Sequence, residues 1–359
     1  MRQAEYIWLD GAEPTQQIRS KTRIVNLPDT QSLDPDAYPE WGFDGSSTYQ
    51  ASGGDSDLIL MPVSVLRDPT RSESDRLVLC EVMTPDGAPH ESNTRAGLRK
   101  LLEMGAAEEQ PWVGFEQEYT LFEGNRPLGF PADGDPAAQG PYYCGVGSRN
   151  ICGRDLVEAH TRACIDANLM IYGTNAEVMP GQWEFQVGYR GVEGESADVL
   201  NVSDHLVMGR WLLHRLSEQF GLRVSLDPKP AKGDWNGAGN HTNFSTASMR
   251  DRATGMHAIN DAVERLSRRH NEHITGYGDG LSDRLTGLHE TCSIHEFKSG
   301  VADRGASIRV PRSVAKHGFG YLEDRRPGAN CDPYTVCTLL LETICADLVE
   351  YADSEQVLV

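Results

Sequence analysis

The sequence predicts an α+β protein of two domains, a small β-rich domain at the N-terminus and a larger domain that interleaves strands and helices. A length of 359 residues suits about two domains and is enough to bury a core. Short strand patterns separated by Asp, Pro, Gly and Ser clusters fill roughly the first hundred residues. Helix patterns alternate with strand patterns in the rest, which is typical of an α+β domain.

The N-terminal elements are short strands followed by a helix. The strand patterns cover Tyr6–Leu9, Thr22–Val25 and Arg76–Val82. A helix is predicted over Thr94–Glu109, because Asn93 or Ser92 can cap it and its leucines share one face. Pro111 ends this helix. We therefore place the domain boundary at residue 107, which gives domains 1–107 and 108–359.

Further helix patterns follow in the second domain. They cover Asp155–Asn168, Asp204–Phe220, His257–Tyr277 and Tyr334–Glu350. Cys337 and Cys345 fall on the apolar pattern of the last helix, which predicts core positions. His270 and His273 are spaced i, i+3 and are expected on the surface.

Composition limits the classes of function. The 33 basic and 53 acidic side chains give a net charge of −20, which argues against nucleic-acid or anionic-membrane partners, because both would be repelled. The chain shows no signal peptide and no apolar stretch long enough to span a membrane, so we expect a cytoplasmic protein. Its eight cysteines form no Cys-x-x-Cys pair and are expected to be reduced thiols.

The strongest local signal is a strand pattern over Val113–Leu121 that carries two glutamates. Apolar residues occupy one parity, and Glu116 and Glu118 occupy the other, so both carboxylates point to one face about 7 Å apart. Like charges this close need a cation between or beside them, or one must take a proton. A solvated strand face is the alternative for a single pair.

The same pattern recurs in later segments, which favours a metal site. Glu184 lies on the polar parity of a strand pattern over Gln182–Val187, and Glu177 precedes it. Two more extended segments offer polar faces: His241, Asn243 and Ser245 in one, and Tyr321, Glu323 and Arg325 in the other. If these segments converge, five glutamates and one histidine without cysteine indicate Mg²⁺ or Mn²⁺ rather than zinc.

An arginine cluster offers groups that bind anions. Its members are Arg304, Arg309, Arg312, Arg325 and Arg326. Arginine forks clamp carboxylate or phosphate oxygens, and surface salt bridges are the alternative. The motifs of P-loop and Rossmann proteins are missing from the sequence. Metal-binding carboxylates beside an arginine cluster therefore suggest phosphoryl transfer from a metal-bound nucleotide.

Seven segments with distinctive residue patterns follow one another over nearly the whole chain: Trp41–Thr48, Phe115–Tyr119, Gln139–Gly147, Asn175–Gly188, Gly233–Ser245, Arg284–Gly287 and Tyr321–Pro333. In these segments and in their order the chain resembles the class II glutamine synthetases, the shorter type shared by eukaryotes and some bacteria. The resemblance implies a β-grasp N-terminal domain and a C-terminal catalytic domain with a curved antiparallel sheet flanked by helices.

The resemblance also implies a reaction and an assembly. ATP would phosphorylate the γ-carboxylate of L-glutamate, and ammonia would displace the phosphate to give L-glutamine, ADP and phosphate. Each site would hold two or more Mg²⁺ or Mn²⁺ ions. The assembly would be a homo-oligomer of two stacked pentameric rings with active sites between neighbouring subunits.

Roles for single residues follow from the resemblance, position by position. One metal ion would be held by Glu118, Glu177 and Glu184, and the other by Glu116, His241 and Glu323. The glutamate site would comprise Glu177, Asn236, Gly237, Arg284, Arg304 and Arg325. The ATP site would comprise Trp112, Asn243, Ser245, Arg309 and Tyr321. Ammonium would meet Asp44, Ser47, Tyr143 and Glu290, with Asp44 offered by the adjacent subunit. The catalytic residues would be Asp44, Glu290 and Arg304.

Two alternatives stay open at this point. A paralogous γ-glutamyl ligase could use another amine or a hydrazine, and the segment Tyr189–Ser203, longer than is usual in the family, is one departure that would allow it. A non-catalytic structural relative should have lost metal ligands, yet all six are present.

Overall fold

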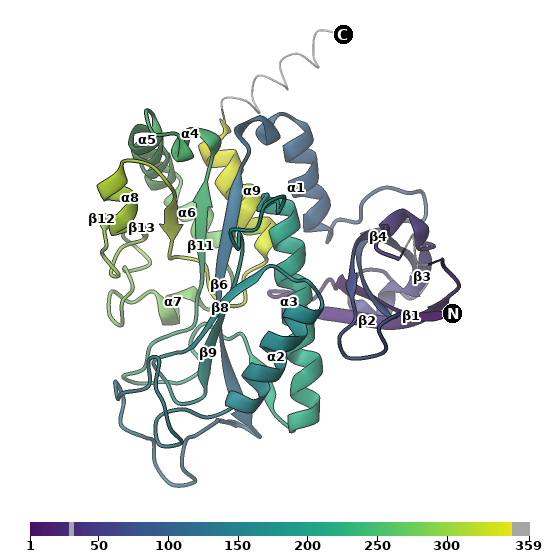
Figure 1. Cartoon of the computed structure of the whole chain (residues 1–359), viewed down its shortest axis with the longest axis horizontal. Coiled ribbons are helices and arrows are strands. Elements are labelled where there is room, and N and C mark those ends of the chain that lie inside the picture. The colour runs from purple at the N-terminus through teal and green to yellow at the C-terminus, as the bar shows by residue number, and fades with distance from the viewer. Residues whose placement is uncertain (29–31, 347–359) are drawn as a thin grey trace.

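The computed structural model describes residues 1–28 and 32–346, which form two β-sheets (Figure 1). The N-terminal sheet has the order β2-β1-β5-β4-β3, with β1 and β5 parallel and the other neighbours antiparallel. Its strands are β1 (Arg2–Leu9), β2 (Ile18–Val25), β3 (Trp41–Asp44), β4 (Asp57–Arg67) and β5 (Arg76–Met83), with 3₁₀ turns η2 (Pro35–Ala37) and η3 (Gly45–Thr48). The three predicted N-terminal strands are confirmed as parts of β1, β2 and β5.

The two faces of this sheet serve different cores. Along β1, Tyr6 and Trp8 pack into a core of the N-terminal domain, whereas Ile7 between them belongs to the main core of the protein. Leu79 of β5 shares this main core with Leu98 of α1 (Thr94–Glu103). The apolar side chains on one face of this sheet therefore join the two domains, and those on the other face form the core of the N-terminal domain.

The second sheet is large and mainly antiparallel. Its main path is β12-β13-β14-β11-β6-β9-β8, with β7 and β10 also paired to β6. The strands are β6 (Trp112–Glu123), β7 (Arg126–Pro127), β8 (Ile171–Ala176), β9 (Gln182–Val187), β10 (Arg223–Ser225), β11 (Asn240–Ser245), β12 (Ser299–Val301), β13 (Ile308–Val310) and β14 (Leu322–Asp324). The central strands β6, β9, β11 and β14 confirm the four predicted polar-faced segments.

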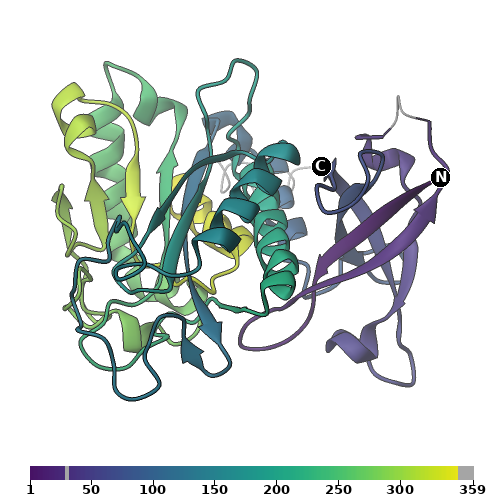
Figure 2. The ribbon, with the colours of Figure 1, turned by 60° about the horizontal axis from the view of Figure 1, so that its bottom comes forward.

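Helices flank the large sheet and connect its strands. They are α1, α2 (Arg154–Asp166), α3 (Val199–Phe220), α4 (Ala247–Arg250), α5 (Gly255–Arg268), α6 (His270–Gly276), α7 (Leu281–Arg284), α8 (Arg312–His317) and α9 (Pro333–Ile344), with the 3₁₀ turn η4 (Ala106–Glu109). In Figures 1 and 2, α3 lies between the large sheet and the N-terminal sheet. Its packing on β6 and β9 leaves the opposite face of these strands for the polar residues.

Several predicted helix limits change in the structure. Helix α3 begins at Val199 instead of Asp204, because the Asp198 carboxylate caps it by accepting from two backbone N–H groups. The helix predicted over His257–Tyr277 divides into α5 and α6 at Arg269. The helix predicted to end at Glu350 ends at Ile344 as α9, and residues 347–350 lie outside the described residues.

The division at residue 107 stays a prediction. Helix α1 precedes it in the sequence but packs against α9 of the second domain. From α1, Arg95 forms ion pairs with Glu81 of β5 at 2.7 Å and with Asp204 of α3 at 2.8 Å, so it connects both domains.

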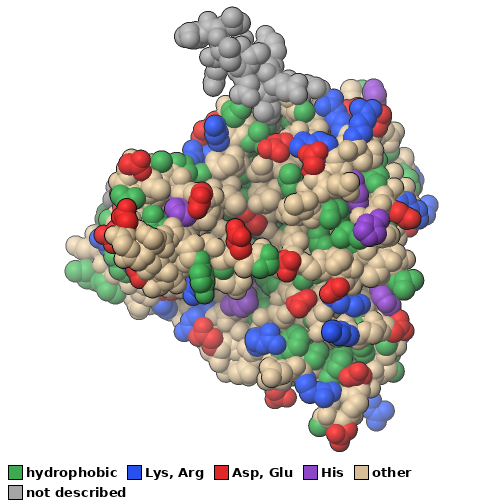
Figure 3. Space-filling view, turned by 180° about the vertical axis from the view of Figure 1, so that it is seen from behind, with side chains coloured by type: hydrophobic (Ala, Val, Ile, Leu, Met, Phe, Trp, Pro, Cys, Tyr) green, Lys and Arg blue, Asp and Glu red, His purple; other side chains and the backbone are tan. Residues whose placement is uncertain are grey.

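The surface carries charges of both signs, and the cysteines are free thiols, as expected from the sequence. Acidic and basic side chains are interspersed on the face seen in Figure 3. All eight cysteines are free, and Cys337 and Cys345 are buried as predicted. Among the described residues, no helix combines the length and apolar character needed to cross a membrane.

Candidate active site

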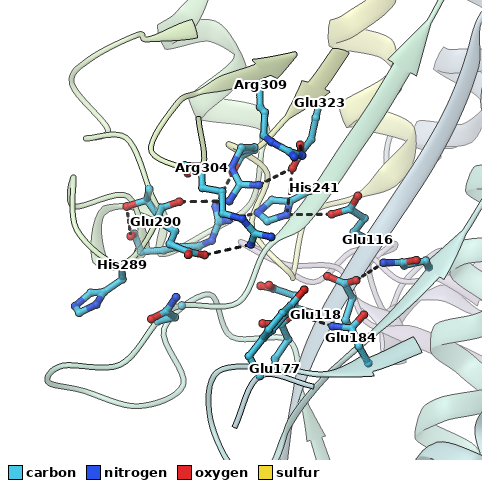
Figure 4. Close-up of a pocket in the computed structure, with 18 residues that line it drawn as sticks. Glu116, Glu118, Glu177, Glu184, His241, His289, Glu290, Arg304, Arg309 and Glu323 are labelled. Carbon is cyan, nitrogen blue, oxygen red and sulfur yellow. Dashed lines mark hydrogen bonds and ion pairs between the residues drawn. The ribbon is translucent and has the colours of Figure 1, made fainter. Parts of the chain in front are cut away.

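A polar cavity of about 220 Å³ lies over the central strands of the large sheet (Figure 4). Most residues that the sequence nominated line it together: Glu116, Glu118, Tyr143, Glu177, Glu184, Asn236, Gly237, His241, Arg284, Glu290, Arg304, Arg309, Glu323 and Arg325. Strand pairing explains the convergence, because Glu116 lies opposite His241 and Glu118 lies opposite Glu184 in adjacent strands.

Three glutamates form the first group, here named the Glu118 cluster: Glu118, Glu177 and Glu184. One carboxylate oxygen from each lies within 4.8 Å of the others. Burial, followed by the charges of Glu116 and Glu118, raises the pKa of Glu184 to about 8. Burial, followed by Glu118 and Glu184, also raises the pKa of Glu177. Three buried acids this close together need either protons or a cation.

Neutral donors orient these carboxylates. Asn175 Nδ2 donates to Glu177 at 2.9 Å, Gln186 Nε2 donates to Glu184 at 2.6 Å, and the Gly239 N–H donates to Glu118. Asn175 and Gln186 were not predicted as site residues from the sequence. The available signal was spacing, since each lies two residues from a cluster glutamate, on the same parity.

The second group, here named the His241 cluster, comprises Glu116, His241 and Glu323. His241 Nδ1 lies 3.3 Å from Glu116 Oε2 and 3.8 Å from Glu323 Oε1. Burial, followed by the charge of Arg325, lowers the pKa of His241 well below its usual range, so the ring is neutral. A neutral imidazole with two carboxylates is a donor set that suits a divalent cation.

Arginines surround the His241 cluster. Glu323 is bridged by Arg309 and Arg325, each at 2.5 Å. Arg284 Nη2 lies 3.1 Å from His241 Nε2, and burial lowers the pKa of Arg284 to about 10. Arg304 lies 3.5 Å from Glu290. This wall of the cavity is therefore cationic, as an anionic substrate would require.

The arginine cluster of the sequence divides between two surroundings. Arg312 begins α8 and is exposed. Arg326, two residues beyond β14, does not line the cavity and forms a buried ion pair with Asp324 at 2.6 Å. The salt-bridge alternative therefore describes Arg326, although this bridge is buried and not on the surface.

Three loops complete the rim of the cavity. His289 and Glu290, both in the left-handed backbone region with φ of 52° and 61°, belong to the loop between α7 and β12. Tyr143 and Asn236 belong to two other loops that share a small apolar core, whose members include Phe130, Tyr142 and Trp235. This core holds the long loops in a defined place without regular secondary structure.

Both domains of the chain match a known protein family. Family models described as "Glutamine synthetase, beta-Grasp domain" and "Glutamine synthetase, catalytic domain" match residues 1–85 and 91–348. The chain belongs to the glutamine synthetase family. It is 55% identical to a glutamine synthetase of Streptomyces viridochromogenes over 96% of this chain and 97% of that relative. It is 51% identical to that of Xenopus laevis over 95% and 85%, so the resemblance to the type shared with eukaryotes is confirmed.

The β-grasp and catalytic domains expected from the resemblance are likewise confirmed. An algal relative, "Glutamine synthetase, chloroplastic" of Chlamydomonas reinhardtii, is 53% identical over 95% of this chain and 90% of that protein.

Of the residues nominated for ATP, Arg309 lines the cavity, whereas Trp112, Asn243, Ser245 and Tyr321 are not among its lining residues. Asn243 Nδ2 donates to Glu116 at 2.9 Å, which places it next to the His241 cluster. Trp112 stacks against Tyr189 with a centroid distance of 5.0 Å, and the Arg250 guanidinium lies 4.5 Å from the indole on which it packs. Neither neighbour of this indole was predicted from the sequence.

The long segment after Gly188 has a structure of its own. Arg190 pairs with Glu195 inside it and also donates to Leu169 O at 3.2 Å. Val113 N–H donates to Ala197 O at 3.0 Å, which ties the segment to the start of β6. These contacts fix the segment near its start and its end, and Tyr189 at its start packs against Trp112.

Two nominated residues, Asp44 and Ser47, do not line the cavity. Both belong to the N-terminal domain and are exposed. The hydroxyl groups of Ser46 and Ser47 donate to Asp44 at 2.6 Å each, and these bonds lower the pKa of Asp44 to about 2. The carboxylate is therefore ionised throughout the neutral range.

The prediction that His270 and His273 lie on the surface is wrong. Both are buried, because α6 packs on α9 and His270 faces Arg326. His273 contacts Tyr277 and Thr343, and the Tyr277 hydroxyl donates to Asp324 at 2.9 Å. This network holds the inner face of the strand whose outer face carries Glu323.

Proposed function

We propose that the protein is a glutamate–ammonia ligase, which forms L-glutamine from L-glutamate, ammonia and ATP through γ-glutamyl phosphate. The observation that carries the proposal is the cavity, in which two carboxylate clusters and four arginines meet in a member of the glutamine synthetase family. A carboxylate is a poor electrophile because oxide is a poor leaving group. Phosphorylation supplies a good leaving group and explains the need for ATP.

Divalent cations fit the two clusters. The Glu118 cluster would hold one ion, because three buried carboxylates with raised pKa values need positive charge. The His241 cluster would hold a second ion. The first cluster offers only carboxylate oxygens, and the second offers two carboxylates and one imidazole; both donor sets suit Mg²⁺ or Mn²⁺. When bound, the ions would offset the negative charge of the triphosphate.

Glutamate binding is assigned to the cationic wall and the loop opposite it. Arg284, Arg304 and Arg325 would bind and orient substrate carboxylates, and Asn236 and Gly237 would add donors from the loop. Glu177 would bind the α-ammonium group of L-glutamate. Arg304, which is half exposed near Glu290, would also offset charge that develops on the transferred phosphoryl group.

The nucleotide would lie beside the His241 cluster. Arg309 would contact its phosphates, and Asn243 and Ser245 of β11 would line the same side. Trp112 and Tyr321 would offer flat aromatic surfaces to the base and ribose.

The ammonium site would be shared between subunits. Glu290 and Tyr143 line the cavity of this chain, while Asp44 and Ser47 are exposed elsewhere and available to a neighbouring cavity. We therefore propose a homo-oligomer, with two stacked pentameric rings as the family resemblance implies. The ionised Asp44 would attract ammonium and accept its proton, and the loop carrying Glu290 would exclude water from the acyl phosphate.

The two alternatives are not favoured. Relatives that cover nearly the whole chain are glutamine synthetases, and Tyr143 and Glu290 both reach the cavity. None of the six metal-ligand candidates is lost, which argues against a non-catalytic relative. A cytoplasmic location and the absence of nucleic-acid and membrane partners stay predictions from the sequence.

The test is ATP-dependent phosphate release with L-glutamate and Mg²⁺, run in parallel with ammonium, hydroxylamine, hydrazine and small amines, with products identified by mass. We expect saturable formation of glutamine with ammonium. Better turnover with an amine or hydrazine would replace the proposal with the paralogous ligase. If no nucleophile gave a product, only the hypothesis of a non-catalytic structural relative would be left.

A further inference from the structure

Gln139 contacts an amide of the cavity without lining the cavity itself. Its Nε2 donates to Asn236 Oδ1 at 2.9 Å and to the Asp234 carbonyl at 3.1 Å. Asn236 is only 8% exposed and lines the cavity, whereas Gln139 is exposed on the outer side of the loop.

This contact determines which end of the Asn236 amide faces the cavity. A primary amide has an acceptor end and a donor end, and Gln139 occupies the acceptor end. Asn236 Nδ2 makes no hydrogen bond to the described part of the chain. The donor end is therefore the one left for a molecule in the cavity.

Both partners are fixed by the same small apolar core. Trp235, which precedes Asn236, is 3% exposed and stacks with Phe130 and Tyr142, and Ala138, which precedes Gln139, packs against the same core. Gln139 itself has φ of 56°. Two loops distant in sequence are thus held so that one amide orients the other.

We propose that Gln139 is a positioning residue for the acid substrate, which holds Asn236 Oδ1 so that Nδ2 donates to a carboxylate of L-glutamate. A turned Asn236 would place an acceptor oxygen against that carboxylate and repel it. This inference rests on the proposed function, and it adds a residue that touches neither substrate nor metal.

Kinetics of Gln139→Ala and Gln139→Glu test the inference. We expect the KM for L-glutamate to rise about tenfold in Gln139→Ala, the size of one hydrogen bond to a charged group. The rise should be larger in Gln139→Glu, because a carboxylate accepts only and would draw Nδ2 away from the cavity. The KM for ATP should stay within about twofold of wild type, since the nucleotide lies elsewhere.

Asn150→Ala is the matched control. Asn150 Nδ2 donates to Val146 O at 3.2 Å in the same loop, so this variant also loses one amide bond to the loop but none to Asn236. We expect it to retain the wild-type KM for L-glutamate. An equal rise in both variants would overturn the inference in favour of general loop disturbance.

A double-mutant cycle with Asn236→Ala separates positioning from loop structure. If Gln139 acts through Asn236, then Gln139→Ala adds nothing in the Asn236→Ala background, and Gln139→Glu is no worse than Gln139→Ala there. Additive effects would overturn the inference while leaving the proposed function intact.

Calorimetric binding of L-glutamate keeps the two failures distinct. If wild type binds L-glutamate but forms no glutamine, the proposed function fails, and the affinities of the same variants still test Gln139. If wild type binds no L-glutamate in the presence of Mg²⁺ and a non-hydrolysable ATP analogue, both proposals are overturned.

Discussion

The Glu118 cluster and the His241 cluster occupy neighbouring parts of one cavity but differ in charge. Three carboxylates form the first, and its closest added donors are neutral amides. Two carboxylates and a neutral imidazole form the second, and two arginines already bridge Glu323. Among the described residues no arginine forms an ion pair with the first cluster, where the charges of Arg284 and Arg325 only partly offset the effect of burial on the pKa of Glu118, whereas two arginines pair directly with the second cluster. We therefore expect the first to bind a divalent cation more tightly.

Removing a ligand from each cluster gives the largest expected effect. Glu184→Gln should weaken the tight cation site by more than about a hundredfold, because it removes a direct ligand and not only its support. His241→Asn should leave that tight site in place and remove the weaker one. Titration with Mn²⁺, followed by electron paramagnetic resonance and calorimetry, checks both. Loss of the same site in both variants would contradict the comparison.

The proton affinity of the Glu118 cluster predicts the next largest effect. Because the pKa of Glu184 is raised to about 8, a cation must displace a proton below that pH. Affinity for the tight cation should therefore rise about tenfold per pH unit up to about pH 8 and then level off. Mn²⁺ titrations between about pH 6 and 9 measure this slope, and a flat profile would contradict the raised pKa.

The raised pKa of Glu184 also predicts how the stability of the metal-free protein depends on pH. A raised carboxyl pKa means that the folded state holds the proton more tightly than the unfolded state, so stability falls as pH rises from the ordinary value of 4.5 to about 8. Glu184→Gln should reduce this decline, and at about pH 8 the metal-free variant should melt above metal-free wild type.

The amide donors should have a smaller effect that is specific to one cluster. Gln186→Ala and Asn175→Ala each remove one bond to a glutamate of the Glu118 cluster, and we expect the tight site to weaken about tenfold in each. Asn243→Ala is the matched control, since its amide donates to Glu116 of the other cluster. Equal effects of all three variants on the tight site would show that the clusters are not independent.

The strands that carry both clusters were predictable from the sequence because the signal is local. A period of two over β6, β9, β11 and β14 places glutamates on one face whatever the neighbouring strands are. β4 and β8 were missed, since each has a register shift in its pairing and β8 contains Gly173 and Asn175, residues that disfavour strands.

Contacts between elements were harder to predict than the elements. The spacing of His270 and His273 identifies a helix face, but only the packing of α6 on α9 shows that this face is buried. Gln139 and Asn236 lie in separate loops without periodicity, so the sequence offers no sign of their hydrogen bond. The resemblance nominated Asp44 and Ser47, yet one chain does not bring them to its own cavity.

Removing one of the arginines that pair with Glu323 gives the smallest expected effect, and it changes the His241 cluster alone. Arg309→Ala removes one of the two guanidinium groups that bridge Glu323. Without nucleotide, the weaker cation should then bind about fivefold more tightly, because a partly exposed ion pair contributes about 1 kcal/mol. The KM for ATP should rise at the same time, since a phosphate contact is lost. Arg309→Lys, which keeps the charge, should show a smaller gain in cation affinity. A loss of cation affinity in Arg309→Ala would mean that the arginine supports Glu323 as a ligand and does not compete with the metal.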